Sequence, residues 1–514
     1  MNATRACFAC FAGEQEALTT DALLKKQPTN QKTTNNFIIK TQQNIVIMLI
    51  PSVSPCTSKV SYLNNADSIA PLQINISVNS SSLQEQVYNV LEEIIPSFLA
   101  EQSRPCDLNV QPLTGGLSNH LFTVRCDHEY GFAVHVDANK IKSTRDEYDL
   151  SPSSTILIRI HDSGVKIEDR NGNVSSDSLN HQYSIVDREH ENKISAALSS
   201  QYLAPTFYGR FQNGRLEEFY ENIRTLSHTE MGDAGFTVEI ARQLGRLHRV
   251  YLDESLNKTN IEDCCFGEVW GRVDEWIDAI NDLYHSGLQN QERLMFKEIQ
   301  EEWQWLQREI GPSRTDQSVT KLKEGEAEIP GGGCIQRRAV QYCRDIVFTH
   351  MDCQSLNILT SVTPTPSSPR SNGKYGTQPK QEIRLIDFEY AGMNPRAADI
   401  GNTFAEFSNM NNLIPDYGKE YPSESCQNIF LTNYIRANGD VMSKEFLSMT
   451  AANRELFLSK MREEIGKHSL ISHLGWACWS LIQCKTSTIA FDYVEYAKIR
   501  MDGYHFFKAR HWPN

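Results

Sequence analysis

The feature that most constrains this chain is the stretch VFTHMDCQSLNILT, residues 347–360, in which a polar run lies between two apolar ones. The apolar runs have the length and composition of short buried strands. The polar run contains an imidazole, a carboxylate and two amides, from His350, Asp352, Gln354 and Asn357. Burying such groups between apolar strands is costly unless each finds a partner. The stretch therefore predicts a rigid, functional loop.

The spacing His350-x-Asp352 followed by Asn357 matches a kinase catalytic loop. There an Asp meets the hydroxyl of the phosphoryl acceptor, and an amide five residues later reaches a metal on the nucleotide. A second acid is expected after a hairpin, to bind the metal that bridges the phosphates. The segment LIDFEY supplies Asp387. Either motif alone fits an Asp that caps a turn, but both in this order favour phosphoryl transfer.

The chain before these motifs offers a phosphate cover and a cation. Gly115 and Gly116 in GGLSNHLF allow close backbone approach and donated N–H groups, although a glycine pair is also common in plain turns. Arg159 interrupts the apolar strand ILIRI, and Glu191 on the following predicted helix is its expected partner. The alternative is a surface Arg on an edge strand.

Composition excludes several other functions. A formal charge of −14 disfavours broad binding of nucleic acid, which requires a basic face. The 13 cysteines match no zinc pattern, and Cys7 and Cys10 lack a second ligand pair. The apolar runs near the N-terminus are too short to span a bilayer, and no secretory signal is recognisable. These observations predict a reduced, cytoplasmic protein without a membrane span.

The pattern along the chain predicts a disordered tail and two lobes. Residues 1–82 are rich in Asn, Thr, Gln and Ser and are expected to be mostly disordered. Residues 83–225 predict a small lobe of antiparallel strands, with a hairpin turning at Asn213-Gly214. Residues 226–514 predict a larger, mainly helical lobe. Flexible insertions are expected at about 311–337 and 361–381, where Gly, Lys, Ser and Pro accumulate.

From about residue 85 to 510 the chain resembles the choline/ethanolamine kinase family, on the motifs GGLSNHLF, ILIRI, NGRLEEF, VFTHMDCQSLNIL, LIDFEYAGMNPRAADIGNTFAEF and GWACWSLIQCKTSTIAFDYVEYAKIR. The resemblance implies an α+β, two-lobed protein-kinase-like fold. It implies Asp352 as catalytic base, Asn357 and Asp387 as Mg²⁺ ligands, and Asp399 as a residue that orients the loop. The residues implied around ATP are Gly115, Gly116, Leu117, Ser118, Asn119, His120, Leu121, Arg159, Glu191, Glu218, Phe219, Tyr220, Arg224, Gln354 and Asp387.

The C-terminal motif predicts a pocket for an amine. A quaternary ammonium has no N–H donor, so aromatic faces and carboxylates hold it best. Each aromatic residue alone is more typical of a core, but position in the family pattern assigns several to the pocket. The residues expected around the amine are Leu117, Ser118, Asn119, Glu389, Glu406, Trp476, Trp479, Phe491, Tyr493 and Tyr496.

The segment after Glu406, FSNMNNLIPDYGKEYP, departs from the choline kinase pattern and is similar to ethanolamine kinases. The resemblance implies ATP-dependent conversion of choline to phosphocholine, the first step of the CDP-choline route to phosphatidylcholine. Ethanolamine kinase, a dual enzyme and an antibiotic-type kinase are the alternatives in the same fold, and an inactive kinase-like scaffold is the alternative of another class. Family members are often homodimers, so a homodimer is expected from the resemblance alone.

Overall fold

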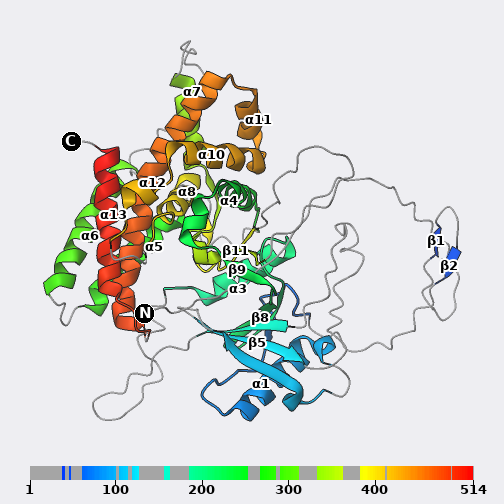
Figure 1. Cartoon of the computed structure of the whole chain (residues 1–514). Helices are drawn as coiled ribbons and strands as arrows, with labels where there is room; N and C mark the ends of the chain where they lie inside the picture. Colours follow the sequence, from blue (N-terminus) through cyan, green and yellow to red (C-terminus); the bar gives the residue numbers. More distant parts are fainter. Residues whose placement is uncertain are drawn as a thin grey trace.

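The computed structural model describes residues 61–99, 103–113, 119–126, 155–161, 185–252, 267–284, 290–311, 333–362, 383–410, 414–487 and 489–512, together with the two short strands β1 (Ile38–Lys40) and β2 (Ile45–Ile47). These residues form two lobes, one built around a sheet and one mainly helical (Figure 1). This two-lobed α+β architecture is the one predicted.

A six-stranded sheet forms the smaller lobe, in the order β3-β7-β8-β6-β5-β4. All neighbouring strands are antiparallel except β3 and β7, which are parallel. The hairpin between β7 and β8 turns at Asn213, as predicted. The strands are β3 (Ile69–Ala70), β4 (Leu108–Leu113), β5 (Asn119–Cys126), β6 (Thr155–His161), β7 (Phe207–Phe211) and β8 (Gly214–Glu218).

Two helices pack on this sheet, α1 (Ser80–Ile94) and α3 (Arg188–Ser200). The Asn79 side chain caps α1 by accepting a hydrogen bond from the Ser82 N–H, and Pro96 follows its end. Apolar side chains three and four residues apart give α1 one buried face. That face and the strands share one small core, which includes Val87, Val90, Leu91, Ile94, Val124, Ile156 and Ile158.

The ordered lobe begins earlier than the predicted boundary at residue 83. Tyr62, Ala70 and Ile74 are buried in the core of the small lobe, and β3 pairs with β7. The Asn213 side chain also bonds the backbone N–H and C=O of Ile74. Residues 61–82 therefore belong to the lobe. The sequence pattern missed them because β3 has only two residues and the rest of the segment is held by turns and single hydrogen bonds.

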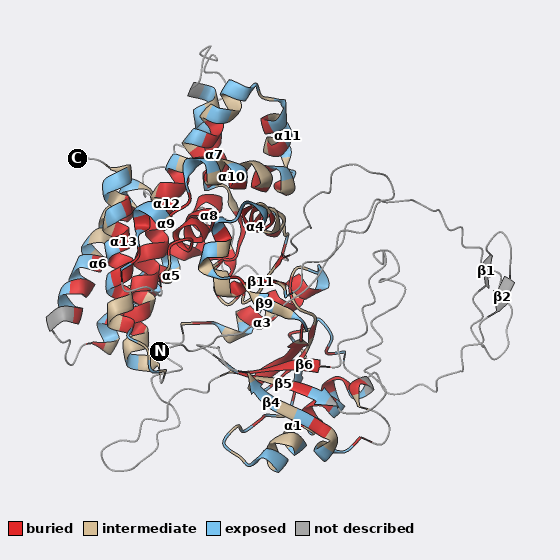
Figure 2. Ribbon diagram, viewed as in Figure 1, coloured by how far each residue is buried: buried red, intermediate tan, exposed pale blue. Residues whose placement is uncertain are grey.

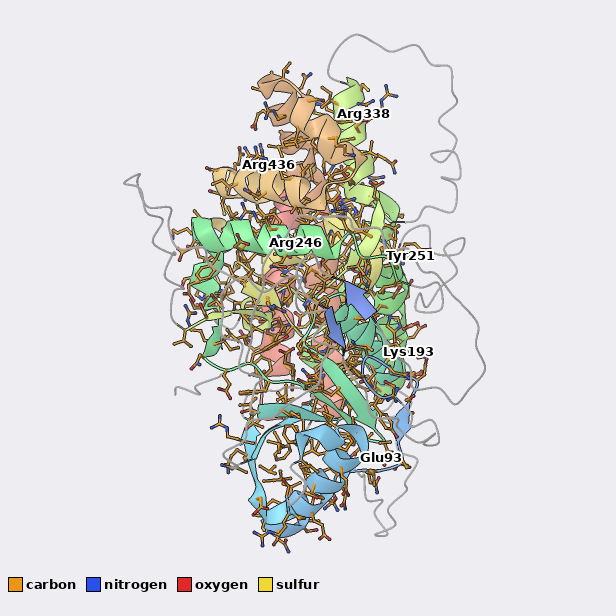
Figure 3. The ribbon with its side chains drawn as sticks, turned by 90° about the vertical axis from the view of Figure 1, so that its right-hand side faces the viewer. Glu93, Lys193, Arg246, Tyr251, Arg338 and Arg436 are labelled. Carbon is orange, nitrogen blue, oxygen red and sulfur yellow. The ribbon has the colours of Figure 1, made fainter. Side chains whose placement is uncertain are left out.

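Helices build the larger lobe, and the buried side chains gather on their inward faces (Figure 2). A view turned by 90° shows the two lobes at opposite ends of the molecule, with Glu93 of α1 at one end and Arg338 of α7 at the other (Figure 3). The helices are α4 (Ala234–Leu247), α5 (Glu268–Leu283), α6 (Asn290–Glu309), α7 (Gly333–Arg344), α8 (Arg396–Ala405), α9 (Tyr417–Glu420), α10 (Glu424–Asn438), α11 (Val441–Ser448), α12 (Ala451–Thr486) and α13 (Tyr493–His511).

Two small sheets place the sequence motifs of the larger lobe. Strand β10 (Ile346–Thr349) pairs with β13 (Gly392–Pro395), and β11 (Ile358–Ser361) pairs with β12 (Ile383–Leu385) and β9 (Ile223–Thr225). The register sets Ile358 opposite Leu385. The residues just before β11 and just after β12 are therefore neighbours, which brings the two acidic motifs to one edge.

The first insertion is shorter at its C-terminal end than predicted. Residues 333–337, expected in the insertion, are the first turns of α7. The helix continues because Ala339, Tyr342 and Cys343 lie on one face and are buried in the core of the larger lobe. Residues 312–332 and 363–382 lie outside the described part. Among the described residues, no helix is both long and apolar enough to cross a bilayer.

Candidate active site

The loop between β10 and β11 is held from behind by Asp399 of α8. Its two carboxylate oxygens accept hydrogen bonds from the backbone N–H groups of His350, at 2.8 Å, and Met351, at 2.7 Å. Met351 has a φ of 62°, a left-handed conformation that is uncommon for a residue with a side chain. The paired bonds from Asp399 compensate for this conformation, so the loop has one fixed shape.

Two buried side chains, His248 and Tyr434, in turn fix the position of Asp399. His248 of α4 lies 2.8 Å from its Oδ2, and the other ring nitrogen of His248 lies 2.6 Å from the Tyr434 hydroxyl. Burial disfavours the charged carboxylate, but the bond to His248 and the nearby His350 hold the pKa of Asp399 below its ordinary value. Asp399 is thus an ionised positioning residue.

Asp352 faces the interior of the site. The Asn357 amide donates to its Oδ2 at 2.7 Å and to its backbone oxygen at 3.0 Å. Burial, followed by the negative charges of Glu406, Asp387 and Glu389, raises the pKa of Asp352 well above its ordinary value. A carboxylate with a raised pKa is a stronger base, which suits the removal of a proton from a hydroxyl.

Asp387 follows β12 and also has a left-handed backbone, with a φ of 66°. Its Oδ1 lies 3.5 Å from Nη1 of Arg159 and has no hydrogen-bond partner among the described residues. The Ile386 N–H next to it donates to the Asn357 carbonyl at 3.0 Å. This bond ties the second acidic motif to the loop that carries Asp352, although the Asn357 amide itself contacts Asp352.

Three carboxylates offer a place for a divalent cation. One oxygen from each of Glu191, Asp387 and Glu389 lies within 4.8 Å of the others. Burial, followed by the charge of Asp387, raises the pKa of Glu389 to about 7, despite Arg188. Such a cluster of hard oxygen donors with an orphaned buried oxygen fits Mg²⁺. Glu389, which was predicted in the amine pocket, also lies beside Asp387 and Glu191.

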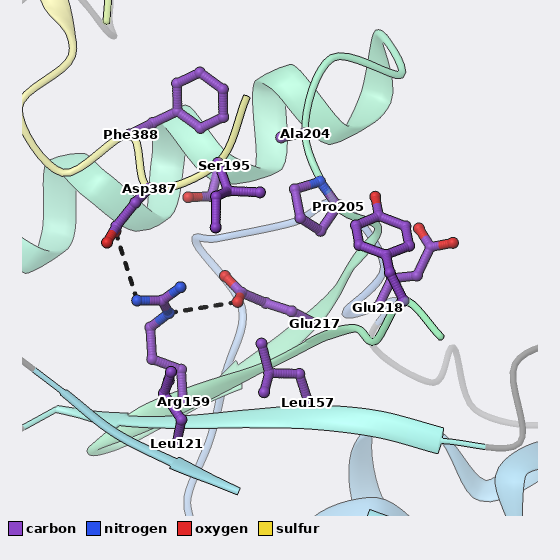
Figure 4. A pocket seen from close by; sticks show the side chains of 12 residues that line it. Leu121, Leu157, Arg159, Ser195, Ala204, Pro205, Glu217, Glu218, Asp387 and Phe388 are labelled. Atoms are coloured by element: carbon purple, nitrogen blue, oxygen red, sulfur yellow. Dashed lines mark hydrogen bonds and ion pairs between the residues drawn. The ribbon is translucent and has the colours of Figure 1, made fainter. Parts of the chain in front are cut away.

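The ion pairs around Arg159 differ from the predicted pair with Glu191. Arg159 contacts Glu217 at 3.4 Å and Asp387 (Figure 4). Glu191 instead contacts Arg215 at 2.7 Å and Arg188 at 2.8 Å. The cause is the sheet register, because β8 sets Arg215 directly opposite Arg159. Arg215 therefore takes Glu191 as a partner, and Arg159 takes Asp387, while both contact Glu217.

Glu217 and Arg188 complete the series of charges. Glu217 forms ion pairs with both Arg215 and Arg159. Arg188 bridges Glu191 and Glu389, with 2.9 Å between its Nη1 and the Glu389 carboxylate. Sequence reasoning missed these residues. The alternation of Arg215 and Glu217, which places both side chains on one face of a strand, was the available signal.

Beside this charged series lies a partly open pocket that is mainly apolar on the side of the sheet (Figure 4). Several residues predicted around ATP line it. Leu121 and Leu157 line it and form a buried apolar cluster with Phe219. The lining residues are Leu121, Leu157, Arg159, Ser195, Ala204, Pro205, Glu217, Glu218, Tyr220, Ile386, Asp387 and Phe388.

Other residues predicted around ATP do not line this pocket or lie outside the described residues. Arg224 is 2.6 Å from Glu230, and its side chain is largely exposed. Gln354 donates its N–H to the Asp352 carbonyl, inside the loop. His120 is exposed on β5, where Asn119 is described by its backbone only. Gly115, Gly116, Leu117 and Ser118 lie outside the described residues.

The predicted aromatic residues come together from α12, α13 and the segment between them. Trp476 and Trp479 have ring centres 5.6 Å apart, and Trp479 lies 5.8 Å from Tyr493 and 6.4 Å from Tyr496. Phe491 lies 5.7 Å from Tyr496. We call these five rings the aromatic cluster. The cluster offers several ring faces to a cation.

Hydrogen bonds orient the two indoles of the aromatic cluster. The Trp476 N–H donates to the Asn402 side chain at 3.1 Å, and the Trp479 N–H donates to the Tyr390 hydroxyl at 2.8 Å. Glu406, one helical turn after Asn402, lies 2.6 Å from Arg500 of α13. Arg500 was not predicted in the site. Its position four residues after Tyr496, on the same helix face, was the available signal.

The fold and the paired acids at one edge of the larger lobe define a protein-kinase-like phosphotransferase for a small molecule. The chain belongs to the choline/ethanolamine kinase family, because the family model "Choline/ethanolamine kinase" matches residues 110–505.

Two relatives and one solved structure illustrate this membership. The chain is 25% identical to the probable ethanolamine kinase A of Dictyostelium discoideum, over 83% of this chain and 93% of that one. It is 26% identical to choline kinase alpha of Mus musculus, over 78% of this chain and 76% of that one. The crystal structure of choline kinase from Cryptosporidium parvum Iowa II shares the fold, with a TM-score of 0.55 and 21% identity, over 83% of this chain and 95% of that one.

Proposed function

We propose that this protein transfers the terminal phosphoryl group of ATP to the hydroxyl of choline, which gives phosphocholine. The observation that supports the proposal is that the segment after Asp387 contacts the aromatic cluster, because the Tyr390 hydroxyl accepts a hydrogen bond from the Trp479 N–H. The Ile386 N–H, beside Asp387, donates to Asn357 in the loop that carries Asp352. A choline bound at the rings would therefore have its hydroxyl near a base.

In this proposal Asp352 orients the hydroxyl and accepts its proton, and Asn357 holds Asp352 in place. Arg159 steadies the phosphates, since its guanidinium lies between Glu217 and Asp387. Asp387, with Glu389 and Glu191 beside it or with Asn357, would hold Mg²⁺. When bound, Mg²⁺ neutralises charge on the phosphate oxygens. Adenine would occupy the apolar part of the cavity near Leu121, Phe219 and Tyr220.

Ethanolamine is the second candidate acceptor. The segment after Glu406 favours it, and the similar proteins include a probable ethanolamine kinase as well as a choline kinase. Steady-state turnover with MgATP on choline, ethanolamine and an aminoglycoside separates the candidates. We expect the highest kcat/KM with choline. A higher value with ethanolamine would replace choline in the proposal, and no nucleotide turnover with any acceptor would favour an inactive scaffold.

We further propose a cytoplasmic location and a place at the entry to phosphatidylcholine synthesis. A homodimer remains a prediction from the family, and sedimentation of the full chain tests it.

A further inference from the structure

Arg500 is a buried cation beside two rings of the aromatic cluster, and the proposed mechanism gives it no role. It is only 2% exposed. Its guanidinium carbon lies 5.0 Å from the centre of the Tyr496 ring and 5.8 Å from that of Trp476. These are the distances at which an aromatic face attracts a cation. The protein therefore places a cation of its own against two of the five rings.

Arg500 also engages the acceptor oxygens of this region. Its Nη2 lies 2.6 Å from Oε1 of Glu406, and its Nε donates to the Tyr496 hydroxyl at 3.0 Å. Glu406 is 8% exposed, so little water competes for its carboxylate. A guanidinium keeps its charge at all physiological pH values. The negative charge of Glu406 is thus balanced by Arg500 within the protein.

The remaining acceptors near the rings are engaged as well. Arg188 contacts Glu389, and the Tyr390 hydroxyl accepts the Trp479 N–H. The Asn402 side-chain oxygen accepts from both Ser472 and Trp476. A primary ammonium carries three N–H donors that need such acceptors. A quaternary ammonium has none and needs only ring faces and a compatible charge.

We infer that Arg500 is a specificity-determining positioning residue, which biases the amine site toward quaternary ammonium groups by holding Glu406 and the Tyr496 hydroxyl. Arg500 acts through these two acceptors and does not itself contact the reacting atoms. The inference rests on the proposed function, since it concerns the amine acceptor of the same site. It explains how a site with a buried carboxylate can discriminate against the smaller, donor-rich amine.

Two substitutions at residue 500 test this inference. Arg500→Gln frees Glu406, so the ratio of kcat/KM for choline to that for ethanolamine is expected to fall at least tenfold, mainly through a lower KM for ethanolamine. Arg500→Lys keeps a cation beside Glu406, so its ratio is expected to stay within threefold of wild type. In the double variant Arg500→Gln with Glu406→Gln, no carboxylate is freed, and the ratio should return toward wild type.

Arg510→Gln is the matched control. It removes one arginine from the same helix, α13, and the guanidinium of Arg510 also lies 5.8 Å from a ring, that of Tyr421, but outside the aromatic cluster. In Arg510→Gln, the ratio of kcat/KM for choline to that for ethanolamine should equal the wild-type ratio. An Arg500→Gln enzyme with an unchanged ratio, or an Arg500→Lys enzyme that shifts as far as the Gln variant, would overturn the inference.

Glu406→Gln gives an independent test if Arg500→Gln does not fold. Because Arg500 already occupies Glu406, this variant should change the choline-to-ethanolamine ratio less than threefold. A selective loss of ethanolamine by tenfold or more would show a direct contact between the substrate ammonium and Glu406, and would refute the inference. Calorimetry without ATP measures the Kd of each amine, and the ratio of the two Kd values can be compared between variants even if the protein transfers no phosphoryl group. Failure of the proposed function can therefore be told apart from failure of this inference.

Discussion

The phosphate side and the amine side of the site are held together by different interactions. On the phosphate side, Arg159, Arg188 and Arg215 alternate with carboxylates from several distant segments. On the amine side, two of the five rings, Trp476 and Tyr496, lie beside Arg500, which pairs with Glu406. Charges that already pair with one another can exchange partners with phosphate and metal, whereas ring faces give shape and a general attraction for cations. We infer that the first side provides the chemistry and the second side the selectivity.

The largest effect is expected from Asp352→Asn, which removes the base but keeps the shape of the loop. We expect kcat to fall by about 10³-fold, within the range of general base catalysis. The KM values for ATP and for the amine should change little, because neither side of the site loses a contact. Steady-state kinetics with equilibrium binding of ATP measure both quantities. A variant with near-normal kcat would refute the assignment of Asp352.

On the phosphate side, Glu217→Gln removes the acid shared by Arg159 and Arg215, both buried. Arg159 keeps Asp387 and Arg215 keeps Glu191, but each loses one buried charged contact, so the free energy of unfolding should fall by about 2 kcal/mol. Urea unfolding followed by circular dichroism measures this loss. Glu221→Gln, on the exposed end of the same segment, is the control, with an expected loss below about 1 kcal/mol. Equal losses in the two variants would show that the charged series does not stabilise the lobe.

The pH dependence should show that the two sides meet at Asp352. Because burial and then Glu406, Asp387 and Glu389 raise the pKa of Asp352, and the base must be ionised, kcat/KM should fall about tenfold per pH unit below that raised pKa. A cation bound near Asp387 favours the ionised form, so more Mg²⁺ should move this acid limb to lower pH. Rate profiles at two Mg²⁺ concentrations test the shift. A limb at the ordinary pKa of an aspartate would contradict it.

On the amine side, Trp479→Leu removes a ring face and leaves a side chain that still packs. One cation–π contact contributes about 1 kcal/mol, so the KM for choline should rise about fivefold to tenfold. The KM for ATP should not change. A parallel rise in both KM values would mean that the two sides are not separable.

The smallest effect is expected from Arg224→Ala. Arg224 pairs with Glu230 at the surface and does not line the cavity. Exposed ion pairs contribute about 0–1 kcal/mol, and we expect the KM for ATP to stay within about twofold of wild type. A tenfold rise would restore Arg224 to the nucleotide site that the family pattern implied.

The sequence predicted what depends on local spacing and missed what depends on register. The order of His350, Asp352 and Asn357, followed by Asp387, indicated the catalytic loop, since these residues come from two short segments that a hairpin joins. The partner of Arg159 could not be predicted, because Arg215 is its neighbour only in the register of β6 and β8.

Long-range contacts also account for two other differences between the prediction and the structure. Residues 61–82 carry too short a strand for a periodic signal, and they join the small lobe through single contacts with residues far along the chain, such as Asn213. The ion pair between Glu406 and Arg500 joins α8 to α13, and nothing in either segment alone indicates it. Long-range polar contacts of this kind appear only once the helices are packed.

The most direct test of the account is a crystal structure of the full chain with choline, a non-hydrolysable ATP analogue and Mn²⁺ in place of Mg²⁺, with the metal located by anomalous scattering. We expect Mn²⁺ at Asp387 together with the phosphate oxygens of the nucleotide, and a choline hydroxyl that faces both Asp352 and the terminal phosphate. Nucleotide and metal bound away from these two carboxylates would contradict it.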